Sequence, residues 1–334
     1  MSSITVKVLA LWLFYIPVAF SAGIGDVFHV KQGSENGGCD SHLSDLTRWW
    51  TESQAMASAG LSAFDDANGN AGDTKTKNAK HALQKYLGID DDTSNEDKED
   101  IKSILLDVQL FMAKKKFLKD DLPWLFCDST WLEQKSRTDK IEECGEEVEI
   151  QDSAKYGPQL EADESSVPYY SSDLDQYVVD QVWGEGGVCA SSRELGVTQG
   201  LTDPSTVTLC PRAFTRTGVE TNFGVDAQGK KLRDVLSKSA TLFHELFHLV
   251  IGSDDTIDAT YDLGTLFKHI EKPYTIPGKS EWDGQRNALK NLDRKTNAML
   301  VRTNPETWVF FCTDYWYTLN KNLYWDTTGV SNTA

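Results

Sequence analysis

The sequence predicts an α+β fold that is mainly α-helical. Several long stretches repeat apolar residues at steps of three and four, which is the spacing of an amphipathic helix. They begin near Cys39, cover residues 101–118 and 286–300, and start again near residue 303. By contrast, the β-branched run at residues 206–210 is short and predicts a strand. We therefore expect a helical body with a small β-sheet.

The first 22 residues have the pattern of a secretory signal peptide. Lys7 precedes an apolar run at residues 8–20, and small residues follow at positions 21–23. The run is too short to cross a bilayer as a helix. We therefore expect a secreted, extracellular protein with no membrane attachment after signal removal. The alternative is an uncleaved membrane anchor.

The remainder predicts one domain with acidic insertions. Residues 23–38 are polar and glycine-containing, which predicts a flexible leader, and residues 39–334 form the expected single domain. An independent helical pro-segment after Cys39 is the alternative. Acidic insertions are expected near 88–100 and 136–165; the first predicts a mobile, solvated loop, and the second a surface insertion. A calcium site in the first block is disfavoured, because the alternating ligand spacing of a calcium loop is absent.

The net charge of −18 disfavours nucleic acid as a partner. Binding to phosphates needs a basic surface, which this acidic chain lacks overall. An acidic protein instead attracts basic substrates through its general field.

Six cysteines follow the predicted signal peptide. An even number in a secreted chain suggests disulfides, but six cysteines allow 15 connectivities and the sequence does not choose among them. The cysteine in the second acidic block is expected to tie that insertion down. The six are Cys39, Cys127, Cys144, Cys189, Cys210 and Cys312.

Residues 241–250, TLFHELFHLV, contain a His-Glu-x-x-His motif. Residues four apart lie on one face of a helix, so His244 and His248 can reach one metal ion, with Glu245 beside it. Neutral imidazole suits zinc. The flanking residues are apolar on nearly all sides and predict a buried helix, where unpaired polar groups are costly. The alternative is two core histidines and a surface glutamate that match the motif by chance.

A third ligand is expected, because catalytic zinc usually has three protein ligands. Gly252 is a plausible end for the helix, and turn-forming residues follow it. They could bring Asp254, Asp255 or Asp258 back under the metal. The residues alone leave these three candidates open.

The motif and the residues after it resemble one family. With Thr256-Ile-Asp-Ala-Thr-Tyr261 downstream, the stretch is similar to the deuterolysin or aspzincin zinc metallopeptidases, which include the fungal peptidyl-Lys metalloendopeptidases. The resemblance implies a zincin-like fold with a small β-sheet beside the active-site helix. It also implies Asp258 as third ligand and Tyr261 as the phenol that stabilises the oxyanion. From its position beside the metal, we expect Glu245 to act as the general base. The chain departs from the family at Asp262, where a glycine is common.

The resemblance has two further implications. It implies a disulfide between Cys189 and Cys210. It also implies a substrate contact after the Asn-Pro pair at residues 304–305, where lysine-specific members have two acids that receive the substrate lysine. Glu306 matches the first of these acids, but Val309 occupies the second position, which argues against lysine specificity.

The sequence thus predicts a secreted zinc endopeptidase that hydrolyses peptide bonds with metal-activated water. One Zn²⁺ per chain is expected on His244, His248 and Asp258, with a protein or peptide substrate and a monomeric state. An edge strand of the small sheet would suit an extended substrate. Two alternatives remain: a secreted binding protein that has lost turnover on a peptidase scaffold, and a zinc scavenger that does not cleave.

Overall fold

A computed structural model describes most of the chain. Residues 1–21 of the predicted signal peptide, the candidate ligand Asp254 and the expected helix at 286–300 lie outside the described residues. The described residues are 22–118, 121–181, 183, 187–190, 194–253, 255–266, 301–326 and 329–333.

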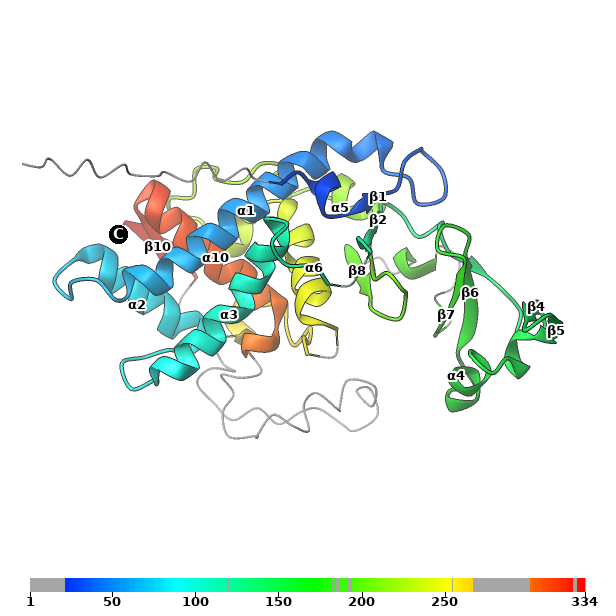
Figure 1. The fold of residues 1–334 in the computed structure, drawn as a ribbon. Coiled ribbons are helices and arrows are strands. Elements are labelled where there is room, and N and C mark those ends of the chain that lie inside the picture. The colour runs from blue at the N-terminus through cyan, green and yellow to red at the C-terminus, as the bar shows by residue number, and fades with distance from the viewer. Residues whose placement is uncertain are drawn as a thin grey trace, which may run out of the picture.

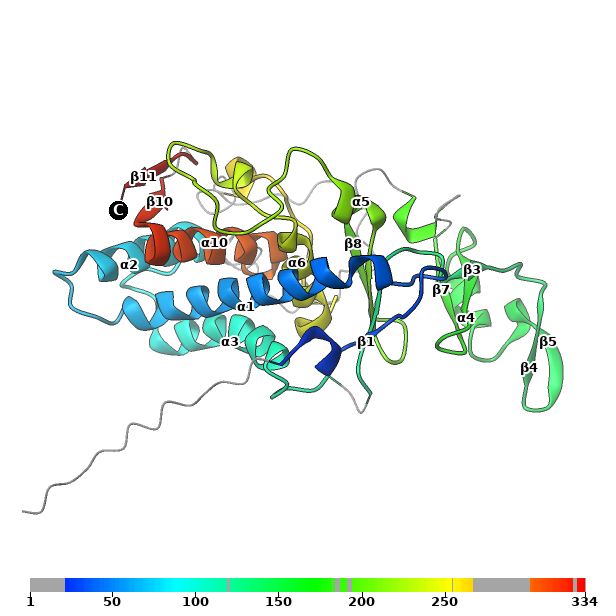
Figure 2. The ribbon, with the colours of Figure 1, turned by 90° about the horizontal axis from the view of Figure 1, so that it is seen from above.

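The described residues form an α+β fold, as the sequence predicts, with a helical body (Figure 1). Helix α1 packs against α10, α6 and α3, and α2 packs against α10 and α1. Figure 2 shows α1 running between α10 and α3. The helices are α1 (Leu43–Asp66), α2 (Thr74–Leu87), α3 (Asn95–Met112), α6 (Ser239–Ile251) and α10 (Pro305–Lys321), with short α4 (Gly157–Ala162) and α5 (Pro211–Thr215).

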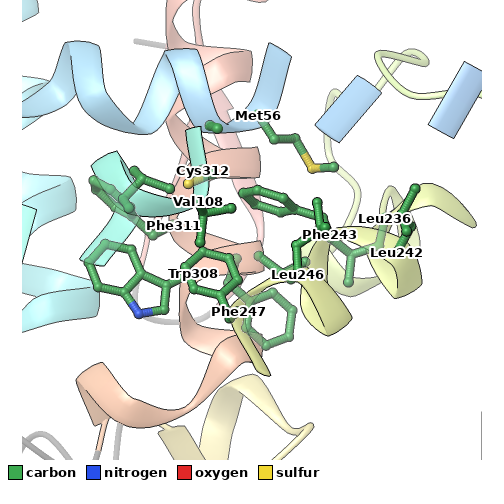
Figure 3. Close-up of a cluster of buried hydrophobic side chains, with 14 of the residues drawn as sticks. Met56, Val108, Leu236, Leu242, Phe243, Leu246, Phe247, Trp308, Phe311 and Cys312 are labelled. Carbon is green, nitrogen blue, oxygen red and sulfur yellow. The ribbon is translucent and has the colours of Figure 1, made fainter. Parts of the chain in front are cut away.

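Helix α6 lies in the core, which agrees with its apolar sequence. Phe243 and Phe247 pack against each other, and Phe247 stacks on Trp308 of α10. Figure 3 shows these rings with Leu246 and Phe311 in one cluster. Truncating a buried ring such as Phe247 to alanine would cost about 3–5 kcal/mol. The helix that bears the His-Glu-x-x-His motif is therefore held rigidly.

A four-stranded sheet lies beside α6, in the order β1-β2-β9-β8. Strands β1, β2 and β9 run parallel, whereas β8 is antiparallel to β9 and forms one edge of the sheet. The strands are β1 (His29–Val30), β2 (Trp124–Phe126), β8 (Gly196–Gln199) and β9 (Thr206–Leu209). A hairpin of β10 (Leu323–Trp325) and β11 (Ser331–Thr333) follows α10.

The expectation of a flexible leader over residues 23–38 is wrong for its first half. Residues 29–30 form β1 within the sheet, and Phe28 is only 1 % exposed. Phe28 packs edge-on against Trp50 and Phe111 of the helical body.

Residues 133–181 form a separate acidic lobe. It carries fourteen acidic and four basic side chains, and it extends from the body on the far side of the small sheet (Figure 1). Its own apolar cluster is small. Its strands are β3 (Glu133–Gln134), β4 (Lys140–Glu143), β5 (Glu146–Glu149), β6 (Val167–Ser171) and β7 (Gln176–Asp180).

The first acidic block is not wholly a loop. Helix α3 begins at Asn95, where the Ser94 hydroxyl accepts from the Asp97 amide at 3.1 Å. Glu96 and Asp97 occupy the first turn, where negative charge favours the helix dipole. The charges that suggested a solvated loop therefore stabilise a helix start.

The six cysteines form two disulfides. Cys189 pairs with Cys210, as the resemblance implied, and Cys39 pairs with Cys127. The expectation that Cys144 ties down the acidic insertion is wrong, because Cys144 is a free, exposed thiol at the β4–β5 turn. Cys312 is free and buried. The disulfides suit an oxidising compartment.

None of the described helices combines the length and the apolarity that crossing a membrane requires.

Candidate metal centre

Helix α6 presents three polar side chains from its buried length. His244, Glu245 and His248 are all buried, although their neighbours on the helix are apolar. The helix ends at Ile251 and is capped by Gly252, whose φ of 106° is a backbone conformation that residues with a side chain rarely adopt. The chain then reverses and returns Asp258 to the two histidines.

His244, His248 and Asp258 form a group that could hold a metal ion. The Asp258 Oδ1 atom lies 3.0 Å from His244 Nε2 and 3.1 Å from His248 Nε2, and the two Nε2 atoms are 3.2 Å apart. One ligand atom from each residue lies within 4.8 Å of the others. Among the described residues, this is the one such group of three or more histidine, cysteine or acidic side chains. Two imidazole nitrogens and a carboxylate oxygen thus converge, which is a donor set suited to a divalent metal.

A hydrogen-bond chain fixes the orientation of His248. Its Nδ1 atom lies 2.7 Å from the Thr256 hydroxyl, which donates its own proton to the Gly252 carbonyl at 2.7 Å. Because the hydroxyl proton is used there, the oxygen accepts from Nδ1–H. The bare Nε2 nitrogen of His248 then faces the metal group, as metal ligation requires.

His244 is oriented from the opposite side by a carboxylate. Its Nδ1 atom lies 3.2 Å from Glu306 Oε2 in the first turn of α10. Glu306 is the residue that the resemblance implied as a substrate contact, and here it pairs with a histidine of the metal group. A carboxylate behind a histidine also favours Nε2 as the metal-facing atom.

Glu245 is 5 % exposed and contacts the edge strand. The Thr198 hydroxyl of β8 donates to Glu245 Oε2 at 2.8 Å. Burial raises the pKa of Glu245, and the charges of His244 and His248 and the Thr198 bond only partly oppose it. A carboxylate with a raised pKa is a better proton acceptor near neutral pH.

Tyr261 lies over the metal group and is open to solvent. Its ring stacks on His244, with centroids 5.6 Å apart and an angle of 22°. The residue is 62 % exposed, which is high for a tyrosine beside a buried histidine. Its phenol hydrogen-bonds to Asp258, and burial together with the charge of Asp258 raises the pKa of that phenol.

Burial and hydrogen bonding shift the pKa values of His244 and Asp258 in opposite directions. Burial alone would lower the pKa of His244, but hydrogen bonds to Asp258 and Glu306 outweigh it and raise the pKa well above its usual value. Burial would raise the pKa of Asp258, yet the hydrogen bond and the charge of His244 lower it strongly. His244 and Asp258 therefore form a hydrogen-bonded ion pair when no metal is present.

All six side chains predicted for the site gather in one place. Of the three candidate third ligands, Asp258 joins the histidines, whereas Asp255 is exposed. The contacts of Thr256 with His248 and of Thr198 with Glu245 were not predicted from the sequence. Thr256 belongs to the motif before Asp258, so the sequence indicates that it is near the site, but it does not predict its hydrogen bond with His248. Nothing in residues 196–199 signals a contact with Glu245, because that contact joins segments far apart in the chain.

No family model, no curated protein and no solved structure matches this chain. The function proposed next therefore rests on the geometry of the metal group and its neighbours.

Proposed function

We propose that the protein is a secreted zinc-dependent endopeptidase with a zincin-like catalytic domain. One observation carries the proposal: His244, His248 and Asp258 converge within 4.8 Å, and Glu245 lies on the same helix beside them. Three protein ligands beside an acid are typical of catalytic rather than structural zinc sites.

The three ligands would hold one Zn²⁺ per chain. When bound, zinc supplies Lewis-acid chemistry, polarising a carbonyl oxygen and lowering the pKa of water. The contacts of Glu306 and Thr256 with the Nδ1 atoms keep both imidazoles turned toward the group. Such partners increase the basicity of the ligands and fix their orientation.

Glu245 acts as the general base and then as the general acid. Its carboxylate accepts a proton from the attacking water and later passes that proton to the leaving amine. Burial raises its pKa, and a higher pKa makes the carboxylate a stronger proton acceptor.

Tyr261 donates a hydrogen bond to the oxyanion of the tetrahedral intermediate. Its exposed ring lies against His244, at the solvent side of the metal group. A donor at this place interacts with charge that develops only in the transition state.

Strand β8 binds the substrate in an extended conformation. It is one of the two edge strands of the described sheet, and it packs against α6. An edge strand offers backbone groups that can pair with an extended peptide. The acidic lobe adjoins this strand, since Gln199 of β8 donates to Asp180 of the lobe at 3.0 Å. Its field favours the approach of basic polypeptides.

The test is casein cleavage by the purified protein, with and without a zinc chelator, beside Glu245→Gln. We expect the wild type to cleave, and the chelator and the variant each to stop cleavage. The variant should retain zinc, because Glu245 is not one of the three ligands. Tyr261→Phe should keep zinc and lose about 10²-fold in rate, as for one oxyanion donor.

Two outcomes contradict the proposal. Cleavage that persists in Glu245→Gln would exclude Glu245 as the general base. A wild type that binds zinc but never cleaves, even after mild proteolytic activation, would favour a binding protein or zinc scavenger on this scaffold.

A further inference from the structure

Two residues of β8 face the carboxylate of Glu245. Successive side chains of a strand point to opposite faces, so Gly196 and Thr198 share one face and Val197 and Gln199 the other. The first face lies against α6. Val197 and Gln199 are thus directed away from Glu245.

Thr198 makes a double contact with Glu245. Its hydroxyl lies 2.8 Å from Oε2 of the carboxylate and 3.2 Å from the backbone carbonyl of the same residue. Within the described residues, this is the one hydrogen bond recorded for the Glu245 carboxylate. The Oε1 atom is left free to take a proton.

Gly196 provides the space that Glu245 occupies. A Cβ atom at position 196 would lie 2.7 Å from Oε1, 2.8 Å from Cγ and 3.0 Å from Cδ of Glu245. Distances below 3.0 Å are not tolerated, so any side chain at position 196 would displace the carboxylate or the strand. Glycine is therefore required here for close approach and not for a special backbone angle.

We propose that Thr198 and Gly196 are positioning residues that together fix the carboxylate of Glu245. Thr198 holds Oε2, and Gly196 leaves room for Oε1 beside the edge strand. This inference rests on the proposed function for its catalytic consequence. A glutamate side chain has three rotatable bonds, and a displacement of about 1 Å in a reacting group can cost about 10²-fold in rate.

The first test removes the hydroxyl while keeping the shape of the side chain. In Thr198→Val, we expect kcat on fluorescein-labelled casein to fall about 10- to 100-fold. We expect KM and zinc content to stay unchanged, because the backbone of β8 and the three ligands are untouched. Thr198→Ser should restore kcat, since it returns the hydroxyl.

Thr206→Val is the matched control for this substitution. Thr206 lies on the neighbouring strand β9, and its buried hydroxyl has no hydrogen-bond partner among the described residues. The same change there should leave kcat unaltered. A loss of kcat in both valine variants would indicate damage to the sheet and overturn the positioning role.

The second test acts from the other side of the carboxylate. Gly196→Ala keeps the Thr198 hydroxyl but inserts a methyl group against Oε1, and we expect a similar fall in kcat. Gly200→Ala is its control, because a Cβ at position 200 would have only Ser253 Oγ nearby, at 3.9 Å. Full activity in Gly196→Ala would contradict the proposal.

Crystal structures of the zinc-loaded wild type and Thr198→Val supply a measurement that does not need activity. We expect the Glu245 carboxylate to shift or lose order in the variant while the three ligands stay in place. An unmoved carboxylate would overturn the inference. If the wild type cleaves nothing, the proposed function fails, but the structures still decide whether Thr198 positions Glu245. If the wild type cleaves and Thr198→Val is equally active, only the positioning role fails.

Discussion

The Nδ1 atom of His244 lies 3.2 Å from a carboxylate oxygen of Glu306, which reaches it from α10, 62 positions further along the chain. This pair joins the helix of the metal group to the helix that packs behind it. An acid that the resemblance implied as a substrate contact thus pairs with a histidine of the metal group. A substrate contact and a partner of His244 predict different effects on zinc affinity and cleavage when Glu306 is replaced.

Glu306→Gln should weaken zinc binding about 10- to 100-fold, which is typical for loss of a partner behind a histidine ligand. The amide removes the negative charge that supports the Nδ1–H proton. Competition with a chromogenic chelator measures the affinity, and Glu220→Gln, which changes a half-exposed acid paired with Lys230, serves as the control. Unchanged zinc affinity, with altered cleavage beside lysine, would instead support a substrate contact.

Thr256→Val should also weaken zinc binding, by about tenfold or more. The valine leaves the Nδ1–H of His248 buried and without an acceptor, which costs about 1–3 kcal/mol. Thr256→Ser keeps the acceptor and should bind zinc as the wild type does. Equal zinc affinities for the valine and serine variants would show that the hydroxyl does not orient His248.

Asp258→Asn should release zinc, whereas Asp255→Asn should not. Among the described residues, Asp258 is the acid with an oxygen within 3.1 Å of both histidines, and Asp255 is exposed. The two substitutions make the same chemical change three positions apart, so Asp255→Asn is the matched control. Zinc content after dialysis is the measurement. The reverse pattern would identify Asp255 as the ligand.

His244 and Asp258 should both contribute fully to the stability of the metal-free protein between about pH 4 and pH 6.5. The pKa of His244 is raised above 6.5 in the folded state, so its contribution is full below pH 6.5 and is lost as pH rises through the folded value. The pKa of Asp258 is lowered below 3.8, so its contribution is present above that value and is lost as pH falls.

Thermal unfolding with excess chelator across this pH range tests the prediction. His244→Gln should flatten the fall in Tm on the alkaline side. Saturating zinc should also remove that fall, because zinc binds neutral histidine and its binding releases protons. A Tm of the metal-free protein that rises from pH 6.5 to pH 9 would contradict the sign of the His244 shift.

Thiol labelling should modify one cysteine in the native, non-reduced protein. Cys144 is exposed and free at a hairpin turn, whereas Cys312 is buried, and burial raises the pKa of its thiol well above the usual value. Both should react in denaturant without reductant. Labelling with a maleimide and mass measurement gives the count, and Cys144→Ser should abolish the native reaction. Four reactive thiols in denaturant would show that one of the two disulfides is absent.

Local pattern was enough to predict the parts of the site that lie on one element. His244, Glu245 and His248 share a helix, and the helical period alone places the two imidazoles on one face. The apolar residues around them predict burial for the same reason, and α6 is buried. A strand ending near Cys210 and a helix after residue 304 were also visible in short stretches.

Average composition misled where charge and burial vary over a few residues. The leader around Phe28 was expected to be flexible, although three apolar residues at positions 27–30 are enough to attach it to the body. The acidic residues before Ile101 were assigned to a loop, but two of them favour the start of α3. The positions of individual residues, rather than the average composition, determine the structure of both segments.

The sequence by itself determined the histidine pair, the nearby acid and the apolar character of their helix, because these follow from spacing along one element. Only the tertiary structure decided that Asp258 rather than Asp255 joins the group, that Glu306 lies behind His244, and that Thr198 and Gly196 face Glu245. Each of these contacts joins residues on different elements. Their proximity depends on the packing of α6 against the edge strand and α10 and on the reversal after Gly252. The spacing of residues along one element cannot predict either of these.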